Sequence, residues 1–587
     1  MRKKNLRSVF HIYLIKPTHY DDDGYPIIWR KTFIPSNSLA VLNGLCMDFA
    51  HRQVIGPNVD VYISVVDEQH TRVVPERIAR HIHQRGERGF VGMVGVQTNQ
   101  FPRALDLAYR FTDCQIPVCM GGFHVAGFLA TMKRLPVEAL EAQRRGISFF
   151  VGESETGRLD EVLMDAWQQK LKPLYNYLGD MPDLGGQPLP QLPMSEVRKS
   201  FGEYAPFDLG RGCPFSCTFC TIINVHGQKS RCRRVDELEQ IIRVNYANGV
   251  RQFFLTDDNI ARNKLWEPFF ERLIQLRREG LRFRILAQVD TACHTIPRFI
   301  PRAVAAGIDQ IIVGIESMNA ENLRHIQKRQ NRIEHYRENL LAWKRFPVVI
   351  TATYIIGLPY DTIERVREDV ATIQRELPID AIYFTNLTPL PGSEVHRDLL
   401  DTGQWLDNDY NKYDTNHYVT THPRMTQAEW REANAVAWRT FYTPEHMQTV
   451  IRRMVACGSN KKLTTIYRLA VCCEFGRGAA IHPLDAGLFR KRYRRDRRPG
   501  YAREGVISFH LAHIADVLKT SWRFHRTIRR LYKLWKRLQH HPDALRYADR
   551  AIAEVASTAK THRLMGGAKE PGQSVVTSSA KSLMQKS

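Results

Sequence analysis

Short apolar runs alternate with stretches of helical periodicity along the first part of the chain. The apolar runs have the length and the branched or aromatic residues of buried strands, and they lie at residues 9–15, 60–66, 90–96, 116–120 and 148–151. The stretches between them place apolar residues at helical spacing, at 38–49, 75–83 and 102–111. Strands that alternate with helices imply parallel strands covered by helices. The pattern therefore predicts an α/β domain over residues 1–168, built as a doubly wound, Rossmann-like sheet.

The alternating pattern breaks at residues 169–205. This segment contains repeated Pro and Gly, including the run Gly-Gly-Gln-Pro-Leu-Pro-Gln-Leu-Pro. Because these residues interrupt helices and strands, the segment predicts a linker at the surface between two domains.

Strand and helix patterns resume after the linker. Six further strands are predicted, each followed by a helical stretch, and they lie at 206–209, 252–255, 283–287, 310–313, 348–356 and 381–387. Six such units predict a partial (β/α)6 barrel over residues 206–400, with its chemistry on the loops at the carboxyl ends of the strands. Residues 401–556 predict a helical, basic region, and the composition of residues 557–587 predicts a disordered tail.

Charge and length narrow the class of protein. The chain has 587 residues, more than one hydrophobic core usually holds, and a formal net charge of +23, which favours an anionic partner. Charge alone does not distinguish a nucleic acid, a lipid surface and a phosphorylated metabolite. No apolar run approaches the roughly 18 to 20 residues that cross a bilayer. We therefore expect a cytoplasmic protein.

Three cysteines in one short stretch are the strongest chemical signal. The stretch reads Arg-Gly-Cys-Pro-Phe-Ser-Cys-Thr-Phe-Cys and contains Cys213, Cys217 and Cys220. This C-x3-C-x2-C spacing lets one tight loop direct three thiolates at a single iron-sulfur cube, whose fourth iron then has no protein ligand. An open iron can bind a small molecule and pass it an electron, which favours a catalytic cluster.

Two other readings of these cysteines are less favoured. Structural zinc sites close with four ligands, whereas only Cys232 and His226 offer a further donor nearby. A disulfide framework is disfavoured because eleven cysteines are sparse in a chain of this length and no secretory signal precedes them.

The cysteine loop, with the aromatic Phe219 before its last cysteine, resembles the signature of the radical S-adenosylmethionine (SAM) enzymes. That resemblance implies a [4Fe-4S] cluster held by the three cysteines, and SAM bound beside it. In the barrel loops it assigns the SAM amino group to Thr256, Asp257 and Asp258, and the ribose hydroxyls to Glu316. The turn at Gly357 resembles the turn that lies beside the adenine of SAM in this family. The alternative for each carboxylate is a cap on the next helix.

The first domain looks like the cobalamin-binding domain that precedes the barrel in one class of these enzymes. Ligands of doubly wound sheets bind at the carboxyl ends of the strands. Those ends have polar or glycine-rich residues, and the candidate cobalamin contacts among them are Thr98, Asn99, Gly121, Gly122 and Glu153. The Asp-x-His-x-x-Gly motif is absent, so we expect no histidine from that motif as the lower axial ligand of cobalt. The alternative is an ordinary turn at the Gly-Gly pair, with His124 capping the next helix.

By resemblance, the function is reductive cleavage of SAM with cobalamin-dependent C-methylation of an unactivated carbon, on a small-molecule or lipid substrate. Three alternatives stay open: a cobalamin-dependent cyclase or rearrangement enzyme, a radical SAM enzyme that modifies RNA, and a non-enzymatic iron-sulfur or cobalamin sensor. The sequence contains no recognisable nucleic-acid-binding module. An electron donor such as flavodoxin or ferredoxin is the expected protein partner.

A basic helix is predicted at residues 521–539. Its apolar stripe lies among arginines and lysines and consists of Trp522, Phe524, Ile528, Leu531, Leu534, Trp535 and Leu538. This pattern is typical of helices on anionic membrane surfaces, and it predicts peripheral membrane attachment of a cytoplasmic protein. A solvated basic helix packed on the barrel would have the same pattern.

Overall fold

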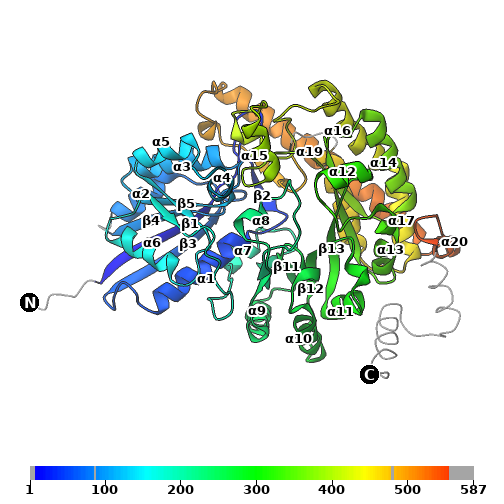
Figure 1. The fold of residues 1–587 in the computed structure, drawn as a ribbon, viewed down its shortest axis with the longest axis horizontal. Helices are drawn as coiled ribbons and strands as arrows, with labels where there is room; N and C mark the ends of the chain where they lie inside the picture. Colours follow the sequence, from blue (N-terminus) through cyan, green and yellow to red (C-terminus); the bar gives the residue numbers. More distant parts are fainter. Residues whose placement is uncertain (1–6, 85–86, 477–480, 554–587) are drawn as a thin grey trace, which may run out of the picture. The chain divides into compact units, whose positions relative to one another are not determined.

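The computed structural model describes residues 7–84, 87–476 and 481–553 (Figure 1). The predicted disordered tail, residues 557–587, lies outside the described residues. The chain divides into two compact units, each assembled from three segments. Unit 1 comprises Met1–Asp258, Thr388–Thr420 and Leu484–Val517, and unit 2 comprises Asn259–Leu387, Thr421–Pro483 and Leu518–Ser587. The predicted domain boundaries remain predictions, and the two units are described separately.

The first sheet of unit 1 has six strands in the order β3-β1-β4-β5-β6-β7, and every neighbouring pair is parallel. Its strands are β1 (Ser8–Lys16), β3 (Val59–Asp67), β4 (Arg88–Met93), β5 (Val118–Gly121), β6 (Ile147–Val151) and β7 (Leu174–Asn176). Five of them match the predicted strands. The sixth, β7, comes from the predicted linker, because a short strand beside Pro and Gly has too few residues to show a pattern.

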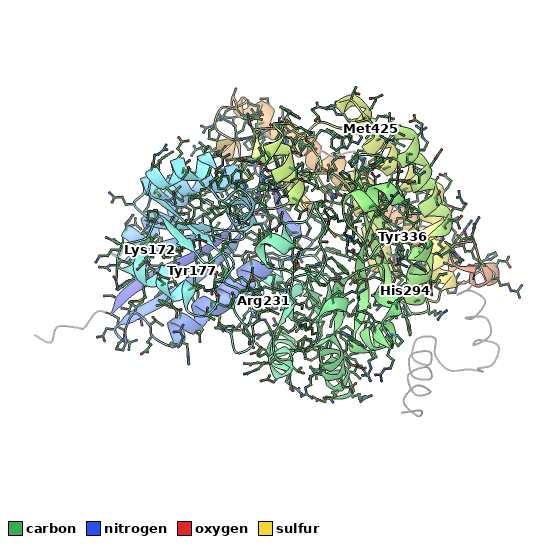
Figure 2. The ribbon with its side chains drawn as sticks, viewed as in Figure 1. Lys172, Tyr177, Arg231, His294, Tyr336 and Met425 are labelled. Carbon is green, nitrogen blue, oxygen red and sulfur yellow. The ribbon has the colours of Figure 1, made fainter. Side chains whose placement is uncertain are left out.

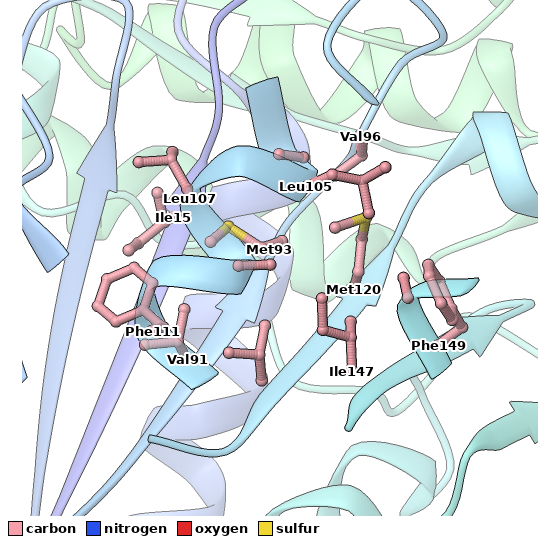
Figure 3. Packing of buried hydrophobic residues seen from close by; sticks show 14 of the residues in the cluster. Ile15, Val91, Met93, Val96, Leu105, Leu107, Phe111, Met120, Ile147 and Phe149 are labelled. Carbon is pink, nitrogen blue, oxygen red and sulfur yellow. The ribbon is translucent and has the colours of Figure 1, made fainter. Parts of the chain in front are cut away.

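Helices cover both faces of this sheet, as the doubly wound prediction requires. Figure 1 shows α3 and α5 on one side and α1 and α6 on the other. The helices are α1 (Asn37–His51), α2 (Pro75–His83), α3 (Phe101–Asp113), α4 (Phe123–Met132), α5 (Val137–Arg144) and α6 (Arg158–Trp167). Apolar side chains of the strands and of α3 form the core between them, with Val91, Phe111 and Phe149 among its fully buried members (Figure 3).

The remainder of unit 1 includes short elements around the cysteine loop. Strands β8 (Tyr204–Phe207) and β11 (Gln252–Leu255) pair in parallel, and β9 (Gly210–Arg211) pairs with β10 (Arg231–Cys232) in antiparallel orientation. The helices of this part are α7 (Met194–Val197), α8 (Ile222–Val225), α9 (Val235–Ala247), α15 (Glu394–Asp401), η3 (Tyr410–Lys412) and η5 (Arg494–Asp496).

A two-stranded antiparallel ribbon in unit 1 escaped the sequence pattern. It pairs β2 (Ile28–Thr32) with β16 (Gly487–Lys491), which lies at the start of a basic run at residues 490–498. Arg490 is buried and pairs with Asp21 at 2.8 Å. Further along the run, Arg498 pairs with Asp409 at 2.7 Å. Part of the basic run therefore neutralises carboxylates of its own unit.

Unit 2 contains four parallel strands in the order β15-β14-β13-β12. They are β12 (Arg284–Val289), β13 (Ile308–Glu316), β14 (Val349–Ile356) and β15 (Ala381–Asn386). The helices between and before them are η1 (Ile260–Arg262), α10 (Trp266–Arg278), η2 (Cys293–Thr295), α11 (Phe299–Ala306), α12 (Ala320–His325), α13 (Ile333–Lys344) and α14 (Ile363–Glu376). Together with β8 and β11 of unit 1, all six predicted strands are present.

The C-terminal region is helical, as predicted. It consists of α16 (Gln427–Phe441), α17 (Pro444–Ala456), α18 (Lys462–Val471), the π-helical turn η4 (Cys472–Gly476), α19 (Val506–Leu538) and α20 (Pro542–Arg546). Thr426 and Glu429 form a capping box that starts α16. Trp430, Trp438 and Phe441 are buried and contribute to its packing. Among the described residues, no helix has the length and apolarity to span a membrane.

Candidate active site

The cysteine loop is fixed at both ends by backbone pairing. In the β9–β10 ribbon Arg211 lies opposite Arg231, which Figure 2 labels, and this ribbon closes the loop at its base. Inside the loop, the amide of Cys213 donates to the carbonyl of Gly227 at 3.2 Å, and the amide of Cys220 donates to the carbonyl of Cys217 at 3.1 Å. The three cysteines are therefore presented by a closed, hydrogen-bonded loop and not by a free strand end.

Glycine is required where the loop begins. Gly212 has a φ of +94°, and a Cβ at this position would lie 2.4 Å from the carbonyl oxygen of Lys229. Its amide donates to Asp258 Oδ2 at 3.3 Å, and the amide of Leu209 donates to Asp257 Oδ1 at 2.7 Å. The two aspartates predicted to contact SAM thus also hold the backbone that leads into the cysteine loop.

The three cysteines have the properties of cluster ligands. All three are free of disulfides, Cys217 is buried, and Cys213 and Cys220 are half-buried. Burial raises the pKa of the Cys220 thiol to about 12, so this thiol must lose its proton when it binds iron. Within the described residues, no three His, Cys, Asp or Glu side chains converge on one point as ligands of a single ion do. A cube binds each cysteine through a different iron, so its ligands need not converge. Phe219 lies half-buried between the last two cysteines.

A buried ionic network joins this loop to the first sheet. Arg211 contacts three carboxylates: Asp208 at 2.8 Å, Glu153 at 3.1 Å and Glu155 at 2.7 Å. Arg231 also donates to Glu153, at 2.8 Å. Burial alone would raise the pKa of Glu153, but the hydrogen bond from Arg231 and the charge of Arg211 lower it. Glu153 is therefore ionised and held against the base of the cysteine loop.

A cavity of about 200 Å³ opens at the carboxyl side of the first sheet. The strand order reverses at β1, whose neighbours are β3 and β4, and ligands of doubly wound sheets bind at such a reversal. Three of the predicted cobalamin contacts, Gly121, Gly122 and Glu153, line this cavity. Thr98 and Asn99 do not, and the Thr98 hydroxyl lies 3.4 Å from Nδ1 of His124.

Several lining residues were missed by the sequence reasoning. Asn37 and Ser38, in the first turn of α1, line the cavity, as do Ser154 and His226. The side chain of Ser36 caps α1 by accepting from the amide of Leu39 at 3.2 Å. A serine before an apolar helical pattern is a signal for a helix start, but it did not reveal that this turn lies beside the strand ends.

His124 is a core residue and not a helix cap. It is fully buried in the second position of α4, with its ring against Phe101 and Tyr410 at centroid distances of 4.1 and 4.7 Å. Burial lowers its pKa to about 3, so the ring is neutral at physiological pH. The N-cap of α4 is Gly122, which corrects the alternative role considered for His124.

The two adjacent glycines of the cavity differ in the space that a Cβ atom would have, and this difference gives a first prediction. Gly122 has a φ of +155°, and a Cβ there would lie 2.1 Å from the Val96 amide nitrogen, whereas the nearest atom to a Cβ on Gly121 is at 3.4 Å. We expect Gly122→Ala to lower the free energy of unfolding by about 1–3 kcal/mol, because backbone must move. Gly121→Ala is the matched control and should change the thermal unfolding midpoint little. Equal midpoints for the two variants would contradict the prediction.

The predicted SAM residues of unit 2 also have structural partners. Glu316 ends β13 with a φ of +59°, is buried, and pairs with Lys328 at 2.7 Å. The hydroxyl of Tyr336 (Figure 2) donates to the carbonyl of the residue before Glu316 at 2.8 Å. The Glu316 carboxylate therefore has a fixed position and a cationic neighbour.

Packing explains the glycine after β14. Gly357 has a φ of +94°, and a Cβ would lie 2.0 Å from the ring of Trp430. Its amide donates to Asp361 Oδ2 at 2.9 Å, and burial raises the pKa of Asp361 to about 7. A packing requirement thus accounts for this glycine, and its predicted place beside adenine stays a prediction.

Comparison with known proteins agrees with this geometry. Residues 208–373 match the Radical SAM superfamily. A bacteriochlorophyllide d C-8(2)-methyltransferase of Chlorobaculum tepidum is 24% identical over 417 residues, which cover 65% of this chain and 87% of that protein. A hopanoid C-2 methylase of Rhodopseudomonas palustris is 21% identical over 358 residues, which cover 60% of this chain and 64% of that protein.

Solved structures share the fold. The radical SAM methyltransferase TsrM of Kitasatospora setae, with cobalamin and a [4Fe-4S] cluster bound, aligns with a TM-score of 0.54 and 13% identity over 75% of this chain and 90% of its own. The cobalamin-dependent radical SAM enzyme OxsB aligns with a TM-score of 0.51 and 11% identity over 94% of this chain and 83% of its own. The predicted fold class is thereby confirmed. Residues 208–373 thus match the radical SAM superfamily, and the chain shares its fold with solved cobalamin-dependent radical SAM enzymes.

Proposed function

We propose that this chain is a cobalamin-dependent radical SAM C-methyltransferase. The observation that carries the proposal is the ionic network of Arg211, which ties the cysteine loop to Glu153 and Glu155 at the rim of the cavity in the first sheet. A cluster loop and a strand-end cavity held by one network suit a reaction that uses two cofactors together. The methyltransferase names of the relatives support the same reaction class.

When bound, the reduced cluster would supply one electron to cleave SAM into methionine and a 5'-deoxyadenosyl radical, which would take a hydrogen atom from the substrate carbon, and the corrin would supply a methyl group taken from a second SAM, which leaves as S-adenosylhomocysteine. The chain contributes positions for them. Cys213, Cys217 and Cys220 would hold three irons as thiolates. Gly121 and Gly122 leave the strand end open to close approach. Because the cavity of about 200 Å³ is smaller than an ordinary ligand pocket of roughly 300–1,000 Å³, it would take only part of a corrinoid.

The residues that we propose as SAM contacts are those assigned by resemblance. Glu316 would accept the ribose hydroxyls, since an ionised carboxylate has acceptor sites beyond the one that Lys328 uses. Thr256, Asp257 and Asp258 would face the SAM amino group. Each aspartate carboxylate accepts a hydrogen bond from one backbone amide, and a carboxylate has acceptor sites for further hydrogen bonds. Phe219 and Gly357 complete the proposed SAM contacts.

The substrate class follows from the relatives. Their names point to a bacteriochlorophyllide and a hopanoid, which are small molecules of apolar or lipid character. We propose a small-molecule or lipid substrate for this chain. An electron donor such as flavodoxin or ferredoxin and an anionic membrane surface are its proposed partners.

Product analysis of the reconstituted enzyme tests the proposal. With cluster, cobalamin, methyl-labelled SAM, reductant, a lipid extract and RNA, we expect both 5'-deoxyadenosine and S-adenosylhomocysteine, and omission of cobalamin should abolish the second product. 5'-Deoxyadenosine without S-adenosylhomocysteine would point to a cyclase or rearrangement enzyme. Label from methyl-labelled SAM in RNA, and not in the lipid fraction, would indicate RNA modification. Absence of both products would favour a sensor.

A further inference from the structure

An unforeseen apolar stripe lies exposed on the long helix α19 (orange in Figure 1). Large apolar side chains recur at helical spacing along its first half, and each is more than half exposed: Ile507 77%, Leu511 64%, Ile514 54%, Leu518 64% and Trp522 61%. Successive members are three or four residues apart, and such positions share one face of a helix. Contiguous apolar side chains of this size on a surface mark an interaction site.

This stripe differs from the one that the sequence indicated. Within the predicted stripe at residues 521–539, Leu531 is only 2% exposed, and Phe524 packs its ring against Tyr467 at 5.6 Å. The ring of Trp535 lies 3.8 Å from the ammonium of Lys462. These members of the predicted stripe pack on the protein. For this part of α19 the burial favours the alternative of a basic helix packed on the protein, whereas Trp522 belongs to the exposed stripe.

Positive charge surrounds the C-terminal end of the exposed stripe. Eight cationic side chains follow Leu518 within α19, and no Asp or Glu occurs between residues 517 and 540; the cations are Lys519, Arg523, Arg526, Arg529, Arg530, Lys533, Lys536 and Arg537. Six of them line a groove with α17 and η4, in which Glu474 is the acidic side chain among the described lining residues. Arg523 pairs with that carboxylate at 2.9 Å.

Two occupants could cover an apolar stripe of this kind, a second copy of the chain or a lipid surface. In a symmetric pair of these helices the eight cations of one copy would meet no acidic set on the other, because Asp516 is the one acidic residue within α19. An anionic bilayer offers both partners at once, since its acyl region accepts the apolar side chains and its head groups attract Lys and Arg at about 1 kcal/mol per residue. Charge complementarity therefore favours the bilayer.

We infer that α19 docks this protein on an anionic membrane surface, with Ile507, Leu511, Ile514, Leu518 and Trp522 inserted at the level of the head groups. The helix lies in the plane of the membrane and does not cross it. This inference deepens the membrane partner proposed above and does not depend on the proposed chemistry. For an apolar substrate, such docking would bring the enzyme to the phase in which the substrate dissolves.

Vesicle binding by the full-length protein tests the inference, measured by co-sedimentation without SAM or reductant. Wild-type protein should bind phosphatidylglycerol-containing vesicles, bind pure phosphatidylcholine vesicles far more weakly, and lose affinity as salt rises. The double variant Leu511→Glu, Leu518→Glu should lose about 100-fold in affinity, because two inserted side chains are replaced by charges. The matched control Val137→Glu, Leu463→Glu changes two equally exposed apolar residues elsewhere, 73% and 66%, and should bind like the wild type.

Other outcomes would overturn the inference. Unchanged vesicle binding by the Leu511→Glu, Leu518→Glu variant would remove the stripe from the interface. A wild-type dimer that this variant dissociates, without vesicle binding by either, would assign the stripe to a second copy. Retention by an unrelated RNA and not by vesicles would assign the basic face to nucleic acid. Because no catalysis is measured, each result leaves the proposed methyl transfer to its own test.

Discussion

Replacement of Cys217 by alanine is expected to abolish SAM cleavage, with the rate of 5'-deoxyadenosine formation falling by more than about a thousandfold. The reason is chemical: the electron for reductive cleavage comes from the cluster, and two cysteines cannot hold a cube in the geometry that three provide. The deeply buried position of Cys217 leaves no solvent-borne thiol to substitute for it. Iron content, the cluster absorbance and product formation are measured on the anaerobically reconstituted protein.

A neighbouring cysteine supplies the control. Cys232 lies in β10, outside the C-x3-C-x2-C spacing and half-buried like Cys213 and Cys220. Cys232→Ala should keep the full iron content and the wild-type rate. A Cys217→Ala protein that retained a four-iron cluster and cleaved SAM would refute the assignment of the loop. Equal loss in both variants would show a folding defect and not the loss of a ligand.

Replacement of Arg211 by methionine is expected to lower the free energy of unfolding by about 3–5 kcal/mol. The substitution leaves Asp208, Glu153 and Glu155 buried with one cation removed from among them, and an uncompensated buried charge is costly. The urea midpoint at unchanged slope measures the effect. The control is Arg397→Met: its side chain is 42% exposed and pairs with the exposed Asp398 at 3.0 Å, and such surface pairs contribute about 0–1 kcal/mol.

The pH dependence of the Arg211→Met variant gives an independent check. In the wild type the pKa of Glu153 is lowered, so its contribution to stability is present above the ordinary Glu pKa of about 4.3 and is lost only at more acidic pH. Without Arg211, one of the cations that lower the pKa of Glu153 is gone while burial still raises it, so this pKa rises and the variant loses stability relative to the wild type as pH rises. The gap between the two proteins should therefore be larger at pH 8 than at pH 5. A gap independent of pH would indicate lost packing instead.

A second substitution distinguishes the effect of the ionic network on cluster binding from its effect on the stability of the fold. Adding Glu155→Gln to Arg211→Met removes one of the unpaired charges, and it should recover part of the lost stability. Occupancy of the cluster should fall in Arg211→Met and rise again in the double variant if the network positions the loop. Recovery of stability without recovery of the cluster would limit Arg211 to a structural role.

Local patterns predicted the elements of this protein well where they were long and regular. The parallel strands of both units were predictable because buried strands are continuous apolar runs. The ribbon of β2 and β16 was not, since it joins segments more than 450 residues apart through only a few residue pairs. β7 escaped for a similar reason, because its three residues lie between Pro173 and the Pro- and Gly-rich stretch that follows, and they show no periodicity.

The candidate site likewise has features that the sequence predicted and features that it did not. The spacing of Cys213, Cys217 and Cys220 required no tertiary information, because one loop contains all three proposed ligands. The partners of that loop did require it: Glu153 precedes Arg211 by 58 residues, and nothing in the sequence pairs them. Asn37 and Ser38 likewise reach the cavity only because α1 begins beside the strand ends.

The amino-acid sequence alone determined the cluster chemistry, the strand and helix alternation and the presence of a basic, amphipathic C-terminal helix, because each depends on spacing within a short segment. Only the tertiary structure decided which carboxylates neutralise Arg211, and which face of α19 stays exposed. The physical reason is that burial and charge pairing depend on neighbours distant in sequence: Leu531 is 2% exposed, whereas Leu518 on the same helix is 64% exposed.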